Sequence, residues 1–165
     1  MLLAVNIGNS NIRFAVFKSD DSVVTWTINS KPARTEYEFF AKFSNMYEPF
    51  GINKEDITDI VIGSVVPPLT MNVMLALKKI HGFNPMIVNR DTPGGIIQYS
   101  KQIGTDLYAN AVSAHHSGIE GKKIVIDFGT ALTFLAIDEV GEVTGVIIAP
   151  GIITALNSLV GETAQ

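Results

Sequence analysis

The most distinctive pattern in the chain is an apolar run that ends in a polar, glycine-containing turn and then resumes as a second apolar run. One copy spans residues 2–16 and turns at Gly8, and another spans residues 122–137 and turns at Gly129. Each copy predicts a buried strand, a sharp turn and a second strand, which together form a hairpin. Gly129 follows Gly8 by 121 positions. The offset indicates an internal repeat on the scale of a domain.

Between the two copies, the patterns of strands and helices alternate. Residues 22–28 are rich in β-formers and predict a third antiparallel strand, as at the start of a ribonuclease-H-like domain. Residues 35–46 open with a capping box and carry Phe39, Phe43 and Met46 at helical spacing. This segment therefore predicts a helix whose aromatic stripe faces the core.

The rest of the chain follows the strand and helix alternation of a parallel α/β arrangement. Apolar residues at helical spacing predict a helix that begins at Pro67 and ends at Gly82. Thr105 is expected to cap a further helix that runs from about Asp106 to His116. The remaining apolar runs predict strands at residues 59–64, 85–88 and 142–149, and an apolar helix follows Gly151.

These elements predict an α/β protein made of duplicated ribonuclease-H-like domains with mixed sheets. We place the N-terminal domain at residues 1–118 and the start of a second domain at residues 119–165. A repeat of the first half would need further strands and helices to complete its sheet. The second domain is therefore expected to be incomplete in this chain.

Composition narrows the class of protein. Hydrophobic residues make up 47% of the chain and charged residues 17%, which is typical of a compact globular protein. The net charge of -4 gives no electrostatic footprint for nucleic acid, and the absence of cysteine excludes disulfides and thiolate metal sites. No basic region precedes the apolar residues 1–5, so we expect neither a signal peptide nor a membrane span, and a cytoplasmic protein.

The two hairpin turns are candidate phosphate cradles. Glycine lets the backbone approach a ligand closely, and a tight turn points successive N–H groups at one spot. Asn9, Ser10 and Thr130 can add hydrogen bonds, and Asp127 can hold a cation. An ordinary hairpin turn uses the same residue types. Two matching copies favour a nucleotide held between domains.

A candidate acidic group begins the helix after residue 104. Asp106 falls in the first turn, where the helix dipole favours an ionised carboxylate. The preceding loop, residues 89–102, can present this carboxylate to a cleft. The residues alone leave two roles open, a charge that only stabilises the helix and a group that acts on a substrate.

Five segments resemble the motifs of the type III pantothenate kinases, in the same order and at similar spacing. They are residues 6–11, 64–69, 104–106, 126–131 and 149–151. The resemblance covers the whole chain and implies an actin-like ATPase fold, duplicated as in hexokinase, and a homodimer. It also implies transfer of the γ-phosphate of ATP to the hydroxyl of pantothenate, the first step of coenzyme A synthesis, with Mg²⁺ and a monovalent cation, K⁺ or NH₄⁺.

The resemblance implies a role for each matching residue. Asp106 would be the general base on the pantothenate hydroxyl, and Asp127 would be a ligand of the monovalent cation. Pantothenate would contact Tyr99, Gly104, Thr105, Asp106 and Leu107. ATP would contact Thr130 and the first hairpin at Asn6, Ile7, Gly8, Asn9, Ser10, Asn11, Ile12 and Arg13. These roles agree with phosphoryl transfer, which depends on positioning and charge neutralisation.

Two positions depart from the family pattern. Asn6 stands where the family usually has an Asp that helps to hold Mg²⁺, and a neutral amide is a poorer ligand for this ion. Leu107 stands where the family usually has an Arg, the natural partner of a substrate carboxylate. They motivate two alternatives to the pantothenate kinase: a non-catalytic nucleotide-binding accessory or regulatory relative, and a kinase of another small alcohol.

Overall fold

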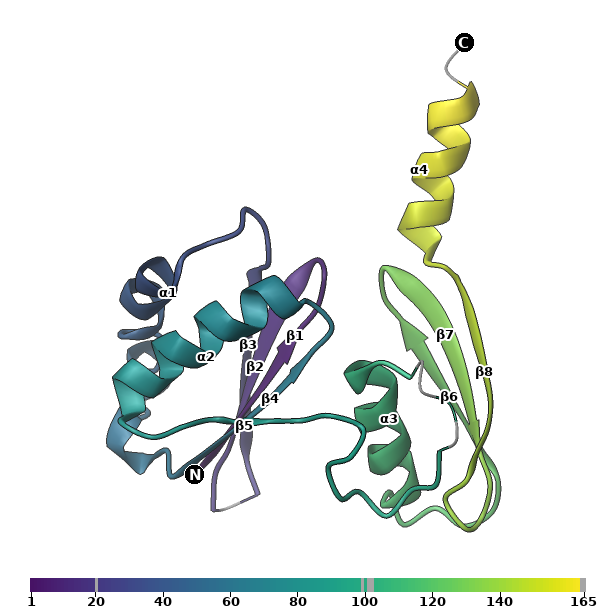
Figure 1. The fold of residues 1–165 in the computed structure, drawn as a ribbon, viewed down its shortest axis with the longest axis horizontal. Coiled ribbons are helices and arrows are strands. Elements are labelled where there is room, and N and C mark those ends of the chain that lie inside the picture. The colour runs from purple at the N-terminus through teal and green to yellow at the C-terminus, as the bar shows by residue number, and fades with distance from the viewer. Residues whose placement is uncertain (20, 99, 101–102, 164–165) are drawn as a thin grey trace. The chain divides into compact units, whose positions relative to one another are not determined.

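The structure, a computed structural model, describes residues 1–19, 21–98, 100 and 103–163. It divides into two compact units, Met1–Asn89 and Arg90–Gln165, which are described separately below (Figure 1). The first unit contains β1 (Leu2–Ile7), β2 (Asn11–Phe17), β3 (Val23–Asn29), α1 (Glu36–Phe43), the 3₁₀ turns Glu48–Phe50 and Lys54–Asp56, β4 (Asp59–Ser64), α2 (Pro67–His81) and β5 (Met86–Ile87). The second contains α3 (Thr105–His115), β6 (Lys123–Phe128), β7 (Ala131–Ile137), β8 (Val143–Pro150) and α4 (Ile152–Thr163).

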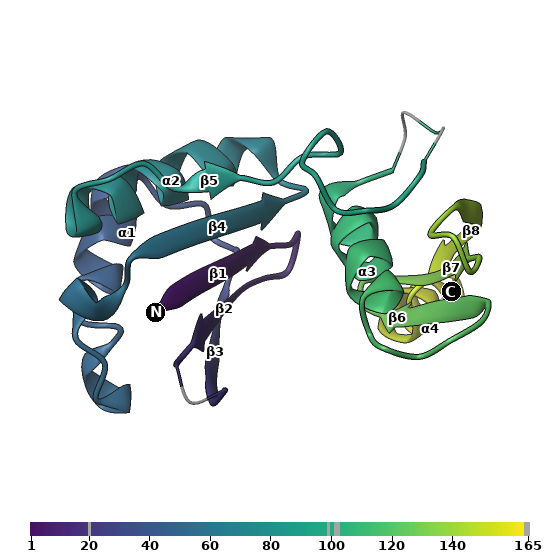
Figure 2. The ribbon, with the colours of Figure 1, turned by 90° about the horizontal axis from the view of Figure 1, so that it is seen from below.

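The first unit is a mixed sheet with the strand order β3-β2-β1-β4-β5. Strands β1, β2 and β3 pair antiparallel, whereas β4 pairs parallel with both β1 and β5. This topology confirms the predicted third antiparallel strand and the two later parallel strands. Helices α1 and α2 lie on the same side of the sheet (Figure 2).

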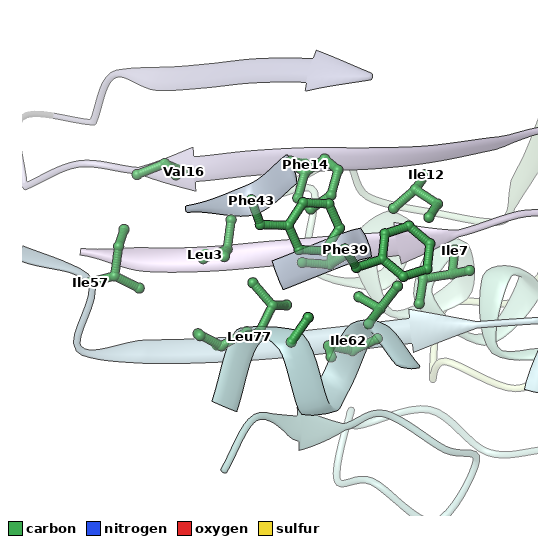
Figure 3. Packing of buried hydrophobic residues seen from close by; sticks show 14 of the residues in the cluster. Leu3, Ile7, Ile12, Phe14, Val16, Phe39, Phe43, Ile57, Ile62 and Leu77 are labelled. Atoms are coloured by element: carbon green, nitrogen blue, oxygen red, sulfur yellow. The ribbon is translucent and has the colours of Figure 1, made fainter. Parts of the chain in front are cut away.

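The core of the first unit fills the space between the sheet and these helices. Alternate residues of β1, β2 and β4 point to this face, and Phe39 and Phe43 from α1 meet them (Figure 3). The rings of Phe14 and Phe43 pack edge to face with centroids 5.2 Å apart. The predicted aromatic stripe is confirmed, with Met46 partly buried against the same core. The fully buried strand residues include Leu3, Ile7, Ile12, Phe14, Val16 and Ile62.

A capping box begins α1, as predicted. The Thr35 side chain accepts a hydrogen bond from the Glu38 N–H, and the Glu38 carboxylate accepts one from the Thr35 N–H at 2.7 Å. Hydrogen bonds from the Thr35 backbone and side chain lower the pKa of the Glu38 carboxyl. Because the folded-state pKa is lowered, this stabilisation is present above the ordinary pKa and is lost as the pH falls through the lowered value.

Thr35→Ala should lower the thermal unfolding midpoint of the first unit by about 2–4 °C at pH 7, because the variant loses one partner of the box. Trp26 is the only tryptophan and packs on Phe14 in this unit, so its fluorescence reports the transition. The difference from the wild type should narrow as the pH falls through the lowered pKa of Glu38, because the protonated carboxyl loses this interaction. An equal midpoint in both proteins at pH 7 would contradict the prediction.

The second unit packs α3 on an antiparallel sheet of order β6-β7-β8. Leu107 and Ala111 from α3 form a buried cluster with Leu135 and Ile137 from β7. Helix α3 therefore groups with the later strands, and the compact units divide the chain between residues 89 and 90. The compact units thus divide the chain at a different place from the domain boundary expected between residues 118 and 119. That boundary stays a prediction.

Much apolar surface of the second unit is exposed in the described part of the chain. Ile124, Ile126 and Phe128 alternate along β6 and are 70%, 48% and 68% exposed. Helix α4 adds further exposed apolar side chains, namely Ile152, Ile153, Leu156, Leu159 and Val160. Contiguous apolar surface of this kind is typical of a face that another segment or molecule covers. Among the helices that the structure describes, none has the length and apolar character needed to span a bilayer.

Candidate functional site

The first candidate turn is held rigidly between β1 and β2. The Gly8 N–H donates to the Asn11 carbonyl at 2.9 Å, and a Cβ added to Gly8 would lie 3.3 Å from that oxygen. Ser30, which is 2% exposed, donates its hydroxyl to the Gly8 carbonyl at 2.6 Å and its N–H to the Ser10 carbonyl at 2.9 Å. Ser30 thus holds the backbone of the turn, while Asn9 and Ser10 are exposed.

Asn6 and Arg13 share the face of the first sheet opposite the core. Both are exposed, and they are paired in register across β1 and β2. On the other side of β1, Asn6 is in register with Gly63 of β4, where an added Cβ would meet nothing within 4 Å. An amide and a guanidinium therefore lie beside open space next to the turn, a combination that can bind an anion such as a phosphate.

The second candidate turn repeats this geometry in the second unit. The Gly129 N–H donates to the Ala131 carbonyl at 3.0 Å, and an added Cβ would again lie 3.3 Å from the accepting oxygen. The turn occupies residues 129–131, one fewer than residues 8–11 of the first copy. Residues of the second copy therefore follow their counterparts in the first by 121 positions as far as the glycine, and by 120 positions in the strand after the turn.

Thr130 is fixed by the segment that follows β8. Its carbonyl accepts a hydrogen bond from the Gly151 N–H at 3.0 Å and another from the Thr154 hydroxyl at 2.9 Å. A hydroxyl thus holds a turn carbonyl in both copies, Ser30 in the first unit and Thr154 in the second. Thr130 itself is exposed at the turn.

Helix α3 places Asp106 in its first turn, as predicted, but the expected cap is wrong. The N-cap residue is Gly104, with φ -68° and ψ 159°, and Thr105 is the first helical residue. Gly104 takes the cap position because its backbone is extended and its carbonyl accepts the first helical hydrogen bond, from the Tyr108 N–H at 3.0 Å. Asp106 is half-buried, and its Oδ1 accepts from the Leu107 N–H at 2.8 Å.

Asn110 connects α3 to Asp127 at the end of β6. Its Nδ2 donates to the Asp127 Oδ2 at 3.4 Å. Asp106 lies four residues before Asn110, so the two side chains share one face of the helix. The two predicted acidic groups, Asp106 on α3 and Asp127 on β6, therefore lie on elements that pack against each other. Asn110 shares the helix face of Asp106 and contacts Asp127.

A cleft of about 470 Å³ lies beside the start of α3. Leu107 contributes to its wall but is only 7% exposed, because most of its side chain packs in the buried cluster with Ala111. Asp106 is not among the described residues of the wall, and Tyr99 lies outside the described residues. The wall combines the start of α3 with β8, through Ser100, Ile103, Leu107, Val143, Thr144, Gly145, Val146 and Ile148.

The donor set limits which metal the protein can hold. Within the described ranges, no group of three His, Cys, Asp or Glu side chains could bind one ion. A closed divalent site made by protein alone therefore does not fit. Asn6 offers one amide oxygen, which suits Mg²⁺ held mainly by phosphates and water. Asp127 is half-buried and forms none of the ion pairs in the described part of the chain, so its carboxylate is available to a cation.

The sequence profile of the type III pantothenate kinases matches residues 2–165 of the chain. The chain belongs to the type III pantothenate kinase family. Its relatives include the type III pantothenate kinase of Finegoldia magna, 36% identical over 168 residues, and that of Zymomonas mobilis, 37% identical over 171 residues. Both alignments cover 100% of this chain but only 64% and 61% of the relatives, so the chain spans less than two thirds of their length.

Solved structures extend the likeness of this family member to the fold. A protein from Sinorhizobium meliloti assigned as a 2-dehydro-3-deoxygalactonokinase aligns with a TM-score of 0.53 at 15% identity, over 99% of this chain and 57% of that one. The activator of the 2-hydroxyisocaproyl-CoA dehydratase from Clostridium difficile aligns with a TM-score of 0.51 at 14% identity, over 90% and 45%. The predicted actin-like ATPase fold, with ribonuclease-H-like topology, is confirmed.

Three residues of this candidate site were not predicted from the sequence. Ser30, Thr154 and Asn110 each donate to a group in a turn or strand that lies well away in the sequence. Asn110 had a usable signal, since it stands one helical turn after Asp106. Ser30 and Thr154 had none, because a single hydroxyl in a polar segment is common.

Proposed function

We propose that this family member transfers the γ-phosphate of ATP to pantothenate, giving 4'-phosphopantothenate and ADP. The observation that carries the proposal is the family match over residues 2–165, which includes both turns and both acidic groups. The packing of α3 on the strand that bears Asp127 supports it. Coenzyme A synthesis would consume the product, and the proposal assigns the reaction to the cytoplasm.

Asp106 is the general base of the proposed reaction. The hydroxyl oxygen of pantothenate forms a bond to the γ-phosphorus while the bond from phosphorus to the β,γ-bridging oxygen breaks. The hydroxyl proton passes to the Asp106 carboxylate, and ADP leaves with the bridging oxygen. The half-buried position of Asp106 supports this role, because the carboxylate is fixed by the Leu107 N–H and remains accessible.

The proposed ATP contacts are the first hairpin, residues 6–13, and Thr130. Within the hairpin, Ile7 and Ile12 would contribute backbone groups only, because their side chains are fully buried in the core. The support for these contacts is the rigid turn geometry, since Ser30 and Gly151 hold the turns in place before any ligand binds. Arg13 supplies positive charge on the open face of the sheet. Mg²⁺ bound to the nucleotide would neutralise phosphate charge, with Asn6 as its neighbour from the protein.

Asn6→Asp should lower the Mg²⁺ concentration for half-maximal activity several-fold and raise turnover, because a carboxylate is a stronger Mg²⁺ ligand than an amide. The measurement is an Mg²⁺ titration at fixed ATP. Asn45→Asp is the matched control, since it adds the same charge at an exposed position after α1 that is not paired with the hairpin. A folded Asn6→Asp protein with no gain over this control would show that residue 6 lies away from the metal.

The cleft beside α3 is the proposed pantothenate site. Leu107 belongs to the segment expected to contact this substrate, and Ser100 follows the expected contact Tyr99 in the sequence; both line the cleft. The apolar wall residues suit the methyl groups of pantothenate, and Ser100 and Thr144 add hydroxyls. Leu107 cannot pair with the substrate carboxylate.

The apolar character of Leu107 at the cleft favours one alternative acceptor class, a small alcohol without a carboxylate. Incubation of the protein with Mg-ATP, K⁺ and either pantothenate or uncharged small alcohols, followed by mass spectrometry of these acceptors, distinguishes the two acceptor classes. Phosphorylated pantothenate supports the main proposal, and phosphorylation of uncharged alcohols alone supports the other acceptor. A folded protein that binds ATP and phosphorylates none of them would instead act as an accessory or regulatory relative.

A homodimer is the proposed assembly. The exposed apolar side chains of α4 and of β6 support it, because a second copy could bury them. Light scattering coupled to size-exclusion chromatography measures the mass. A mass of one chain across micromolar concentrations would contradict the dimer.

A further inference from the structure

The contact between Asn110 and Asp127 suggests a role for a residue that has none so far. Asp127 lies in the alternating row Lys123, Val125, Asp127 of β6, whose members are half-buried while their neighbours are exposed. Val125 packs against the cluster that α3 covers. Asp127 therefore lies on the face of the sheet that α3 covers. It follows the apolar contact of Val125 and meets the polar side chain of Asn110.

A half-buried carboxylate is stabilised by a hydrogen-bond donor or a cation beside it. No Lys, Arg or His forms an ion pair with Asp127 within the described residues. The partner it has is the neutral amide of Asn110, which donates to one carboxylate oxygen, Oδ2. Such a donor favours one orientation of the carboxylate and leaves its charge and its second oxygen, Oδ1, available.

We infer that Asn110 is a positioning residue that holds the Asp127 carboxylate ready for a monovalent cation. This inference rests on the proposed function in one respect, the assignment of Asp127 as a cation ligand. A lysine or arginine at position 110 would neutralise Asp127 and compete with the cation. An apolar residue there would leave the carboxylate free to rotate away.

The distance between Asn110 and Asp127 distinguishes a positioning role of Asn110 from a role in the stability of the fold. At 3.4 Å, the distance between Asn110 Nδ2 and Asp127 Oδ2 is longer than in a typical hydrogen bond, so the contact adds little to the stability of the fold. Loss of the amide should therefore leave the unfolding midpoint in the absence of the cation almost unchanged. The cation affinity should change instead, because groups that orient a metal ligand commonly alter affinity 10–100-fold, as a rough range.

The test is thermal unfolding of the 165-residue chain in KCl against choline chloride at equal ionic strength, followed by circular dichroism. K⁺ at about ten times its dissociation constant should raise the wild-type midpoint by roughly 3–6 °C. Asn110→Ala should keep the midpoint in choline within about 2 °C of the wild type. Its half-saturating K⁺ concentration should rise about tenfold.

Three further variants sharpen the result. Asn110→Leu keeps the branched shape of the side chain without the donor, and it should weaken K⁺ binding as Asn110→Ala does. Asp127→Asn should abolish the K⁺ effect. Ser113→Ala, at an exposed position one turn along the same helix, should behave as the wild type. If either Asn110 variant folds and retains the wild-type K⁺ response within about twofold, the inference is wrong.

The outcome is independent of turnover. If the wild type shows no K⁺-dependent shift, the inference is overturned whether or not the protein phosphorylates pantothenate. If the shift depends on both Asn110 and Asp127 but no pantothenate is phosphorylated, the inference stands and the proposed function fails.

Discussion

Asp106→Asn should lower kcat for pantothenate-dependent ADP release by about 10²–10⁴-fold, the usual contribution of a positioned general base. The substitution keeps the size of the side chain and its place in the first turn of α3, so the fold should persist. KM for pantothenate should change little, because the amide can still accept a hydrogen bond from the substrate hydroxyl. Steady-state kinetics with saturating Mg-ATP measure both constants.

The control for this variant is Glu139→Gln, which removes one carboxylate from an exposed position between β7 and β8. It should retain the wild-type kcat, since a distant surface charge has a small effect on the barrier. A loss of activity in both variants would indicate a general electrostatic effect. Wild-type kcat in Asp106→Asn would show that another group accepts the proton.

Gly151→Ala should destabilise the second unit by about 2–3 kcal/mol and reduce activity with it. A Cβ at this position would overlap the Gly129 carbonyl oxygen and would lie 2.6 Å from the Thr130 oxygen and 2.9 Å from its carbonyl carbon. These are backbone atoms of the turn, which cannot move aside as a flexible side chain does. The turn that carries Thr130 must therefore shift, and the Gly151 N–H must lose its bond to Thr130.

Hydrogen exchange of the β6, β7 and β8 amides, read by mass spectrometry, measures this effect in the second unit. Trp26 fluorescence should not change, because this residue belongs to the first unit. Gly145→Ala is the matched control on β8, since a Cβ there meets nothing within 4 Å. Equal protection in the two variants would contradict the steric argument.

The parts of the fold that the sequence predicts are those determined by short-range patterns. The capping box of α1, the end of α2 at Gly82 and the hairpin of β1 and β2 each depend on neighbouring residues, and all three are confirmed. The start of α3 was displaced by one residue, because Thr105 and Gly104 are both acceptable caps by composition. Backbone conformation decided between them.

Contacts between distant segments could not be predicted from the sequence. Ser30 and Thr154 support the turns through single hydrogen bonds over separations of 22 and 24 residues. The placement of α3 with the second unit depends on the packing of Leu107 and Ala111 against β7, which no local pattern specifies. Leu107 also shows that one side chain can serve the core and line a cleft.

The most direct test of the central claim is ADP release by the wild-type chain with Mg-ATP and K⁺, measured with and without pantothenate in a coupled assay. Pantothenate should accelerate ADP release, and 4'-phosphopantothenate should accumulate in equal amount. A folded preparation whose ADP release does not respond to pantothenate would contradict the proposed kinase activity.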